Sequence, residues 1–155
     1  MAKPKVVLTT GAFDILHTGH LMLLQSAKAL AGPGGRLVVV VARDSTVEKR
    51  KGRRPVVPED ERRRMVEALK PVDEAILGYQ DLSISKILEK VKPGIIVFGY
   101  DQRDLEDETR RFVNERRLPL EIVQLRKFSS GNLDSGSKIK DRIAETWRPE
   151  GPCRA

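Results

Sequence analysis

The sequence holds very little redox or metal-binding chemistry. Cys153 is the only cysteine among 155 residues, so the chain can form no internal disulfide and no metal cluster built from thiolates. No apolar run approaches the ~20 residues that a membrane-spanning helix needs. The residues before Val6 also lack the apolar core of a secretion signal. We therefore expect a cytoplasmic protein with one domain over residues 1–148 and a flexible tail over residues 149–155.

Aromatic residues are scarce as well, at 5 % of the chain, whereas the formal net charge is +7. Basic domains often bind polyanions, and much of the excess charge lies in two clusters, residues 49–54 and 62–64. Domains that bind single-stranded nucleic acid usually add aromatic side chains on which bases stack, and none are interleaved here. A small phosphorylated ligand therefore fits better, and a basic nucleic-acid-binding module is kept as the alternative.

Histidine is the third scarce residue type. Both histidines, His17 and His20, lie between an apolar run at residues 6–8 and the apolar start of a helix at Leu21. Residues three apart share one face of a helix, so both imidazoles are expected to point at one spot near the helix N-terminus. Helix N-termini attract anions through free N–H groups and the helix dipole. The segment therefore predicts a place where a phosphate is held and its charge is stabilised.

Short apolar runs alternate with amphipathic stretches along the whole chain. The pattern predicts strands at 6–8, 37–41, 74–77, 95–98 and 120–125, and helices at 21–30, 45–50, 58–70, 83–91, 104–117 and 135–146. Such alternation is typical of an α/β fold, here a Rossmann-like, doubly wound, five-stranded parallel sheet with helices on both faces. These sheets bind ligands at the carboxyl ends of their strands. We therefore expect residues 10–20, Asp44 and residues 99–102 to converge on one crevice.

Four stretches carry a resemblance to a known family. His17-Thr18-Gly19-His20 matches the H-x-G-H signature of the nucleotidylyltransferase superfamily, and Gly11–Asp14 resembles its G-T-F-D. Ser135–Ile139 resembles the second signature of the superfamily, and Val72–Ile76 resembles the V-D-E-V-I element of cytidylyltransferases. The order and spacing agree from about residue 5 to about residue 143. Within the superfamily the chain is most similar to archaeal-type FAD synthases, on residues 41–47, 51–55, 68–73 and 99–102.

The resemblance implies transfer of a nucleotidyl group from a nucleoside triphosphate, with Mg²⁺, to a phosphate acceptor, and release of pyrophosphate. For an FAD synthase (FMN adenylyltransferase) the substrates are ATP and FMN. For glycerol-3-phosphate cytidylyltransferase, the alternative, they are CTP and glycerol 3-phosphate. A homodimer is compatible with the resemblance. A flavin-binding electron carrier is a further alternative, although a basic surface suits it poorly.

The resemblance also implies roles for particular residues. The expected catalytic residues are His17, His20, Lys51 and Arg62; Lys51 is favoured over Lys49, and Arg62 is expected to steady either the basic loop or the triphosphate. The expected nucleotide-binding residues are Thr10, Gly11, Ala12, Phe13, Gly19, Gly99, Asp101, Ser135, Ser137 and Lys138. The expected acceptor-binding residues are Asp14, Asp44 and Tyr100, and we expect no metal site built from protein side chains alone. Ala12 stands where the family has threonine, so Thr10 or Thr18 is expected to supply that hydroxyl, and Trp147 is expected to pack.

Overall fold

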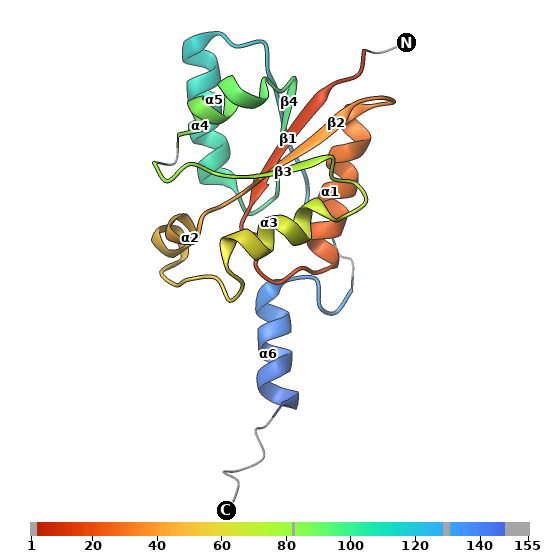
Figure 1. Ribbon diagram of the computed structural model, residues 1–155, viewed down its shortest axis with the longest axis vertical. Coiled ribbons are helices and arrows are strands. Elements are labelled where there is room, and N and C mark those ends of the chain that lie inside the picture. Colours follow the sequence, from red (N-terminus) through yellow and green to blue (C-terminus); the bar gives the residue numbers. More distant parts are fainter. Residues whose placement is uncertain (1–2, 82, 129–130, 148–155) are drawn as a thin grey trace, which may run out of the picture.

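The computed structural model describes residues 3–81, 83–128 and 131–147 (Figure 1). Five strands form one sheet in the order β3-β2-β1-β4-β5. The strands are β1 (Val6–Gly11), β2 (Arg36–Val41), β3 (Glu74–Leu77), β4 (Ile95–Phe98) and β5 (Glu121–Gln124). Every pairing between neighbouring strands is parallel. The predicted α/β fold with a five-stranded parallel sheet is therefore confirmed.

Helices cover both faces of this sheet. They are α1 (Thr18–Ala31), α2 (Asp44–Lys51), α3 (Glu59–Glu67), α4 (Ile84–Val91), α5 (Arg103–Arg116) and α6 (Gly136–Thr146). Helices α1 and α3 contribute Leu24 and Val66 to a core cluster on one face. Helices α4 and α5 pack Ile87 and Phe112 against a second cluster on the other face.

The valine run of β2 shows why the sheet is central. Val39 and Val41 belong to the first core cluster, whereas Val38 and Val40 belong to the second. Alternate side chains of a strand point to opposite faces, so a strand that is covered on both sides needs apolar residues at every position. That need explains the continuous run that predicted this strand.

The strand order places a switch point between β1 and β4. The chain leaves β1 toward β2 on one side of the sheet and reaches β4 on the other side of β1. At such a point the connections diverge and leave a crevice at the carboxyl ends of the strands. Gly11 ends β1 and Phe98 ends β4, so the sequence motifs that follow these strands face this crevice.

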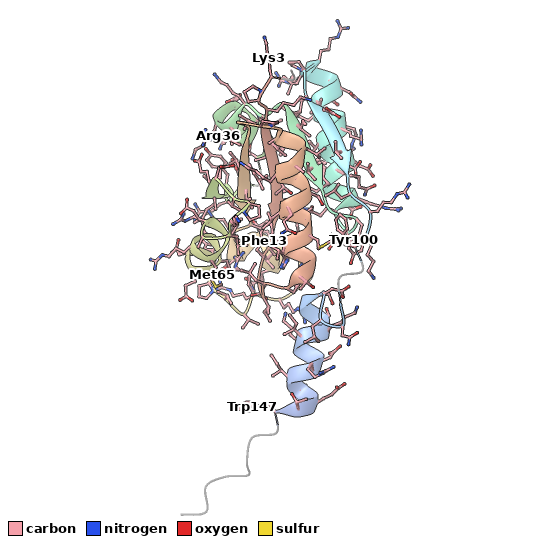
Figure 2. The ribbon with its side chains drawn as sticks, turned by 90° about the vertical axis from the view of Figure 1, so that its right-hand side faces the viewer. Lys3, Phe13, Arg36, Met65, Tyr100 and Trp147 are labelled. Atoms are coloured by element: carbon pink, nitrogen blue, oxygen red, sulfur yellow. The ribbon has the colours of Figure 1, made fainter. Side chains whose placement is uncertain are left out.

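The start of α1 and the surroundings of Trp147 differ from the sequence prediction. Helix α1 begins at Thr18, ahead of the predicted Leu21, because the His17 side chain caps it by accepting a hydrogen bond from the N–H of His20. Helix α6 projects from the body of the protein (Figures 1 and 2), and Trp147 at its end is 70 % exposed. The prediction that Trp147 packs is therefore wrong. Residues 148–155, which hold Cys153 and the predicted tail, lie outside the described residues.

Candidate active site

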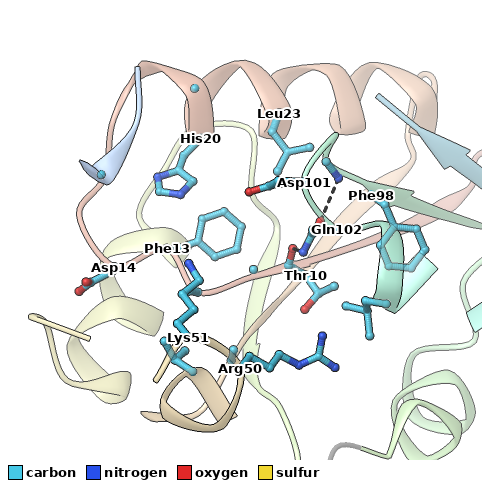
Figure 3. A pocket seen from close by; sticks show the side chains of 18 of the residues that line it. Thr10, Phe13, Asp14, His20, Leu23, Arg50, Lys51, Phe98, Asp101 and Gln102 are labelled. Atoms are coloured by element: carbon cyan, nitrogen blue, oxygen red, sulfur yellow. Dashed lines mark hydrogen bonds between the residues drawn. The ribbon is translucent and has the colours of Figure 1, made fainter. Parts of the chain in front are cut away.

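A cavity of about 910 Å³ opens at the carboxyl ends of β1, β2 and β4 (Figure 3). It collects nearly all the residues that the sequence predicted for the site. Those that line it are Thr10, Gly11, Ala12, Phe13, Asp14, His17, Gly19, His20, Lys51, Gly99, Tyr100, Asp101, Ser135, Ser137 and Lys138. Segments far apart in the sequence therefore meet around one space, as the strand-end argument predicted.

The two imidazoles form a stacked pair at the N-terminus of α1. Their ring centroids lie 3.7 Å apart and the rings are inclined by 22°. Nδ1 of His17 accepts the N–H of His20 at 3.3 Å. A neutral imidazole has one donor and one acceptor nitrogen, so this contact assigns the ring hydrogen of His17 to Nε2. The pair therefore presents a fixed donor.

Nδ1 of His20 is the one buried side-chain nitrogen or oxygen without a hydrogen-bond partner among the described residues. Burial, together with the positive charge of Lys51 and the neighbouring His17, lowers the pKa of His20 to about 3. Burial also lowers the pKa of His17, although Asp134 and Asp101 oppose that effect. Both rings are therefore neutral near pH 7 in the unliganded protein. A buried polar atom that lacks a partner is costly unless a ligand supplies one.

The loop before α6 lies directly against the N-terminus of α1. A Cβ on Gly19 would stand 2.5 Å from the carbonyl oxygen of Asp134 and 2.9 Å from Nδ1 of His17. Only glycine permits this approach, which brings Ser135 beside the histidines. Ser135 caps α6 by accepting the N–H of Lys138 at 3.3 Å, and Nζ of Lys138 lies 2.6 Å from the Asp134 carboxylate. The N-terminus of α6 is thus fixed at the rim of the cavity.

Positive charge surrounds the cavity. Lys51 ends α2, whose cap Gly52 takes the left-handed conformation at φ 73°, and its charge contributes to the low pKa of His20. Lys51 lines the cavity, whereas Lys49 does not. The other cationic residues on its walls are Arg50, Arg53, Arg54, Arg103, Arg126, Lys127 and Lys140. This concentration of cations suits a ligand with several phosphates.

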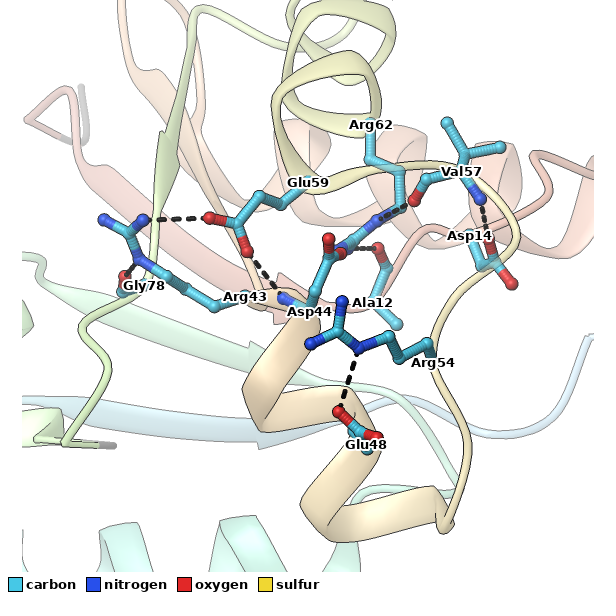
Figure 4. Close-up of polar contacts among 10 residues, drawn as sticks. All are labelled: Ala12, Asp14, Arg43, Asp44, Glu48, Arg54, Val57, Glu59, Arg62 and Gly78. Atoms are coloured by element: carbon cyan, nitrogen blue, oxygen red, sulfur yellow. Dashed lines mark hydrogen bonds and ion pairs between the residues drawn. The ribbon is translucent and has the colours of Figure 1, made fainter.

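A buried arginine ties together three segments behind this wall (Figure 4). Arg62 is fully buried, and it donates to the carbonyl oxygens of Ala12 and Val57 and, at 2.6 Å, to the carboxylate of Asp44. Its guanidinium nitrogens are therefore engaged inside the protein. Glu59 adds a second link, because its carboxylate accepts the N–H of Asp44 at 2.6 Å. These contacts fix α2, and with it Lys51, relative to the turn after β1.

Asp14 joins the same turn to two other elements. Its carboxylate accepts the N–H of Val57 at 2.9 Å and lies 3.5 Å from Nζ of Lys140 in α6. Burial raises the pKa of Asp14, but hydrogen bonds from the backbone N–H groups of Val57 and Val56 and the charge of Lys140 outweigh it, so the pKa lies below the ordinary value. Asp14 is thus an anion that holds three segments around the cavity.

Comparison with known proteins identifies the family. Residues 8–142 match the family model described as Cytidylyltransferase-like. The chain belongs to this family. The cytidylyltransferase-like chain is 48 % identical over 145 residues to a protein named FAD synthase from Methanopyrus kandleri, covering 93 % of this chain and 95 % of that one. It is 47 % identical to the FAD synthase of Aciduliprofundum boonei, covering 90 % of each. The predicted resemblance to nucleotidylyltransferases is confirmed.

Solved structures agree with this assignment. A crystal structure described as a lipopolysaccharide core biosynthesis protein from Thermoplasma volcanium has 41 % sequence identity and a TM-score of 0.72, and the match covers 80 % of this chain and 98 % of that one. Pantothenate synthetase from Thermus thermophilus, at 18 % identity and a TM-score of 0.57, shares the fold alone and is covered over 55 % of its length. The fold of this chain is therefore shared with a solved structure at 41 % identity and with one at 18 % identity.

Two predicted site residues of this cytidylyltransferase-like chain lie behind the cavity wall. Arg62 and Asp44 do not line the cavity, because each is turned toward the other at 2.6 Å. A buried guanidinium requires an anionic partner, and Asp44 supplies it. Of the two roles expected for Arg62, these contacts favour holding the basic loop over contact with the triphosphate, and Asp44 faces Arg62 instead of the acceptor.

The structure also gives a role to Gln102, which the sequence placed at the crevice within residues 99–102 without assigning it one. Gln102 accepts the N–H of Gly99 at 2.9 Å and donates to the carbonyl oxygen of Thr10 at 2.9 Å, so it bridges the ends of β4 and β1 (Figure 3). Its position directly after a strand end was the available signal. Arg126 and Lys127, which follow β5, were missed although the same signal applied to them. Among the described residues, no group of three His, Cys, Asp or Glu side chains could hold a metal, and no helix is long and apolar enough to cross a membrane.

Proposed function

We propose that this chain is an FAD synthase, which transfers AMP from ATP to the phosphate of FMN and releases pyrophosphate. The observation that carries the proposal is the meeting of His20, with its unpartnered Nδ1, and Ser135 at the start of α6 around one cation-rich cavity. The relatives named FAD synthase match the chain over about nine-tenths of both lengths. An adenylyl-transfer enzyme acting on FMN accounts for both facts.

The proposed reaction needs positioning and charge stabilisation. A phosphate oxygen of FMN attacks the α-phosphorus of ATP, a new P–O bond forms, and the bond between that phosphorus and the oxygen of the β-phosphate breaks. Pyrophosphate leaves with the electron pair. Such a step is accelerated by fixed donors aimed at the developing charge. His17, through Nε2, and His20 are the proposed donors to the α-phosphate.

The neutral state of the histidines is part of this proposal. A phosphate beside an imidazole favours the charged form and raises its pKa, so binding of the triphosphate opposes the effect of burial on His20. The unpartnered Nδ1 of His20 then gains a hydrogen-bond partner. Lys51 and Lys138 are the proposed counter-charges for the β- and γ-phosphates. Ser135 and Ser137, with the N–H groups at the N-terminus of α6, are the proposed hydrogen-bond donors to them.

Mg²⁺ is proposed to enter with the nucleotide. This ion is usually held by one or two carboxylates, phosphate oxygens and water. The Asp101 carboxylate lines the cavity and fits that donor set, so it would hold the ion together with phosphate oxygens and water. Asp14, whose carboxylate contacts Val57 and Lys140, would act on it through water. When bound, the metal would neutralise charge on the triphosphate. The cytoplasmic location and the homodimer stay predictions.

A matrix of two nucleotides and two acceptors tests the proposal. ATP or CTP is mixed with FMN or glycerol 3-phosphate, with Mg²⁺, and the products are identified by mass. We expect FAD and pyrophosphate from the ATP and FMN pair, and loss of product when a chelator removes Mg²⁺. CDP-glycerol as the main product would instead favour the glycerol-3-phosphate cytidylyltransferase alternative, which the description of the family keeps open.

A further inference from the structure

The cavity has a second, chemically different end. Among the apolar side chains that line it on the α4 and α5 side of the sheet, across the switch point from the histidines, we refer to six as the apolar recess. They are Val40, Tyr79, Ile84, Ile87, Phe98 and Leu105. All six belong to, or pack against, the second core cluster. The cavity therefore runs from a charged end at α1 and α6 to an apolar end below α4.

The recess lies against the second core cluster. Val40, Ile87 and Phe98, which are 3 %, 8 % and 0 % exposed, form the buried layer behind it. Tyr79, Ile84 and Leu105 are partly buried and form its mouth. Nζ of Lys86 lies over the ring of Tyr79, 5.6 Å from its centroid, which holds that ring in place. Concave apolar walls with few convergent polar groups are typical of sites for flat organic ligands.

The order of chemistry along the cavity limits what can occupy the recess. The histidines and the α6 N-terminus are suited to phosphate, and the donors and acceptors of Thr10 and Gln102 lie near the middle, at the ends of β1 and β4. A ligand that lies along this path has a phosphate at one end, a polar chain, and a wide apolar ring at the other end. FMN has this order of groups. Glycerol 3-phosphate has no apolar part and would leave the recess unfilled.

We propose that the apolar recess binds the isoalloxazine ring of the acceptor flavin and thereby selects FMN over small phosphorylated acceptors. The inference rests on the proposed function, since it assigns a part of the same cavity to one of the two substrates. Tyr79 offers an aromatic face for stacking, and the aliphatic side chains of Ile84 and Leu105 flank the ring. The phosphate of FMN then extends toward His17, His20 and Lys51.

Two polar substitutions at the mouth of the recess test this assignment. Ile84→Asn and Leu105→Asn are compared with Val91→Asn, a change on α4 in a side chain that packs against the same core cluster but does not line the cavity. FMN binding is measured by quenching of flavin fluorescence, and the KM values for FMN and ATP are measured separately. Thermal melts check that each variant is folded, and two sites are used so that one unstable variant does not end the test.

We expect the Kd and KM for FMN to rise about tenfold or more in both recess variants, with the KM for ATP within about twofold of wild type. Val91→Asn is expected to leave both KM values unchanged. A raised KM for ATP with normal FMN binding would mean that the recess holds the nucleotide base, and unchanged FMN binding in folded recess variants would also overturn the assignment. Fluorescence quenching needs no turnover. Loss of FMN binding in the variants therefore supports the recess even if wild type makes no FAD, a result that would refute the proposed function alone.

Discussion

The side chain of His17 serves the backbone of His20. Its Nδ1 accepts the His20 N–H at 3.3 Å while the two rings stack with centroids 3.7 Å apart. One residue thus ends the loop after β1, caps α1 and packs against the buried second imidazole. The H-x-G-H spacing is consequently a structural requirement as well as a chemical one, because the third residue after an N-cap is the one whose N–H the cap receives.

Replacing His17 separates its role as the cap of α1 from the role of its ring in the reaction. Asparagine is a good N-cap and alanine is a poor one, with a typical difference of about 1 kcal/mol. We expect His17→Ala to lower the free energy of unfolding by about 1 kcal/mol more than His17→Asn, while both variants lose most nucleotidyl transfer because both lack the ring. Urea unfolding and initial rates measure the two effects. Equal unfolding free energies would show that the capping bond contributes nothing.

The low pKa of His20 predicts a particular acid sensitivity. Between about 3, its pKa in the folded protein, and 6.5, the ordinary pKa of a histidine, the unfolded chain holds more protons at this site than the folded protein does. The free energy of unfolding therefore falls as the pH is lowered through this window, and above pH 6.5 the group has no such effect. We expect His20→Asn to lose less stability than wild type between pH 7 and pH 5, as measured by urea midpoints. Parallel pH profiles would contradict the assigned pKa direction.

Arg62 is expected to matter for stability far more than its neighbours in the same basic cluster. Arg62→Met removes a buried guanidinium and leaves the partly buried carboxylate of Asp44 without its partner. Loss of one member of such a pair costs about 3 kcal/mol or more. Arg64→Met is the matched control, since Arg64 is exposed on the same helix, and a change within about 0.5 kcal/mol is expected for it. Similar unfolding midpoints for the two variants would refute the structural role of Arg62.

The contrast between Arg62 and Arg64 also shows how much of the structure could be predicted from the sequence. The valines of β2 and the strand-end rule were enough to predict the sheet and to bring residues 10–20 and 99–102 to one crevice. Which arginine of residues 62–64 turns inward depends on the position of α3 against the sheet, and that position arises only in the packed protein. The family resemblance singled out Arg62 among the three, but its burial follows only from the packed position of α3. The recess was missed for a related reason, since Ile84 and Leu105 follow ordinary helical core spacing and only tertiary packing leaves them facing an open space.

The close approach at Gly19 leads to a prediction in which stability and activity move apart. Gly19 is the second residue of α1, and a Cβ there would meet the Asp134 carbonyl at 2.5 Å. Because that atom belongs to the backbone, the loop that carries Ser135 must withdraw. We expect Gly19→Ala to stay folded with a modest fall in melting temperature and yet to lose about a hundredfold in rate, the typical effect of displacing a site by about 1 Å.

Gly94→Ala provides the control for this experiment. Gly94 precedes β4 at the opposite end of the sheet from the cavity, and the nearest atom to its added Cβ is the Val6 carbonyl oxygen at 4.0 Å. The rate of pyrophosphate release by Gly94→Ala is expected to match that of wild type. Initial rates of pyrophosphate release and thermal melts are measured for both variants. If Gly19→Ala retains its rate within about twofold, the contact between the α1 N-terminus and the loop before α6 is not what assembles the site. If Gly19→Ala is largely unfolded at the assay temperature, the loss of rate instead reflects general unfolding.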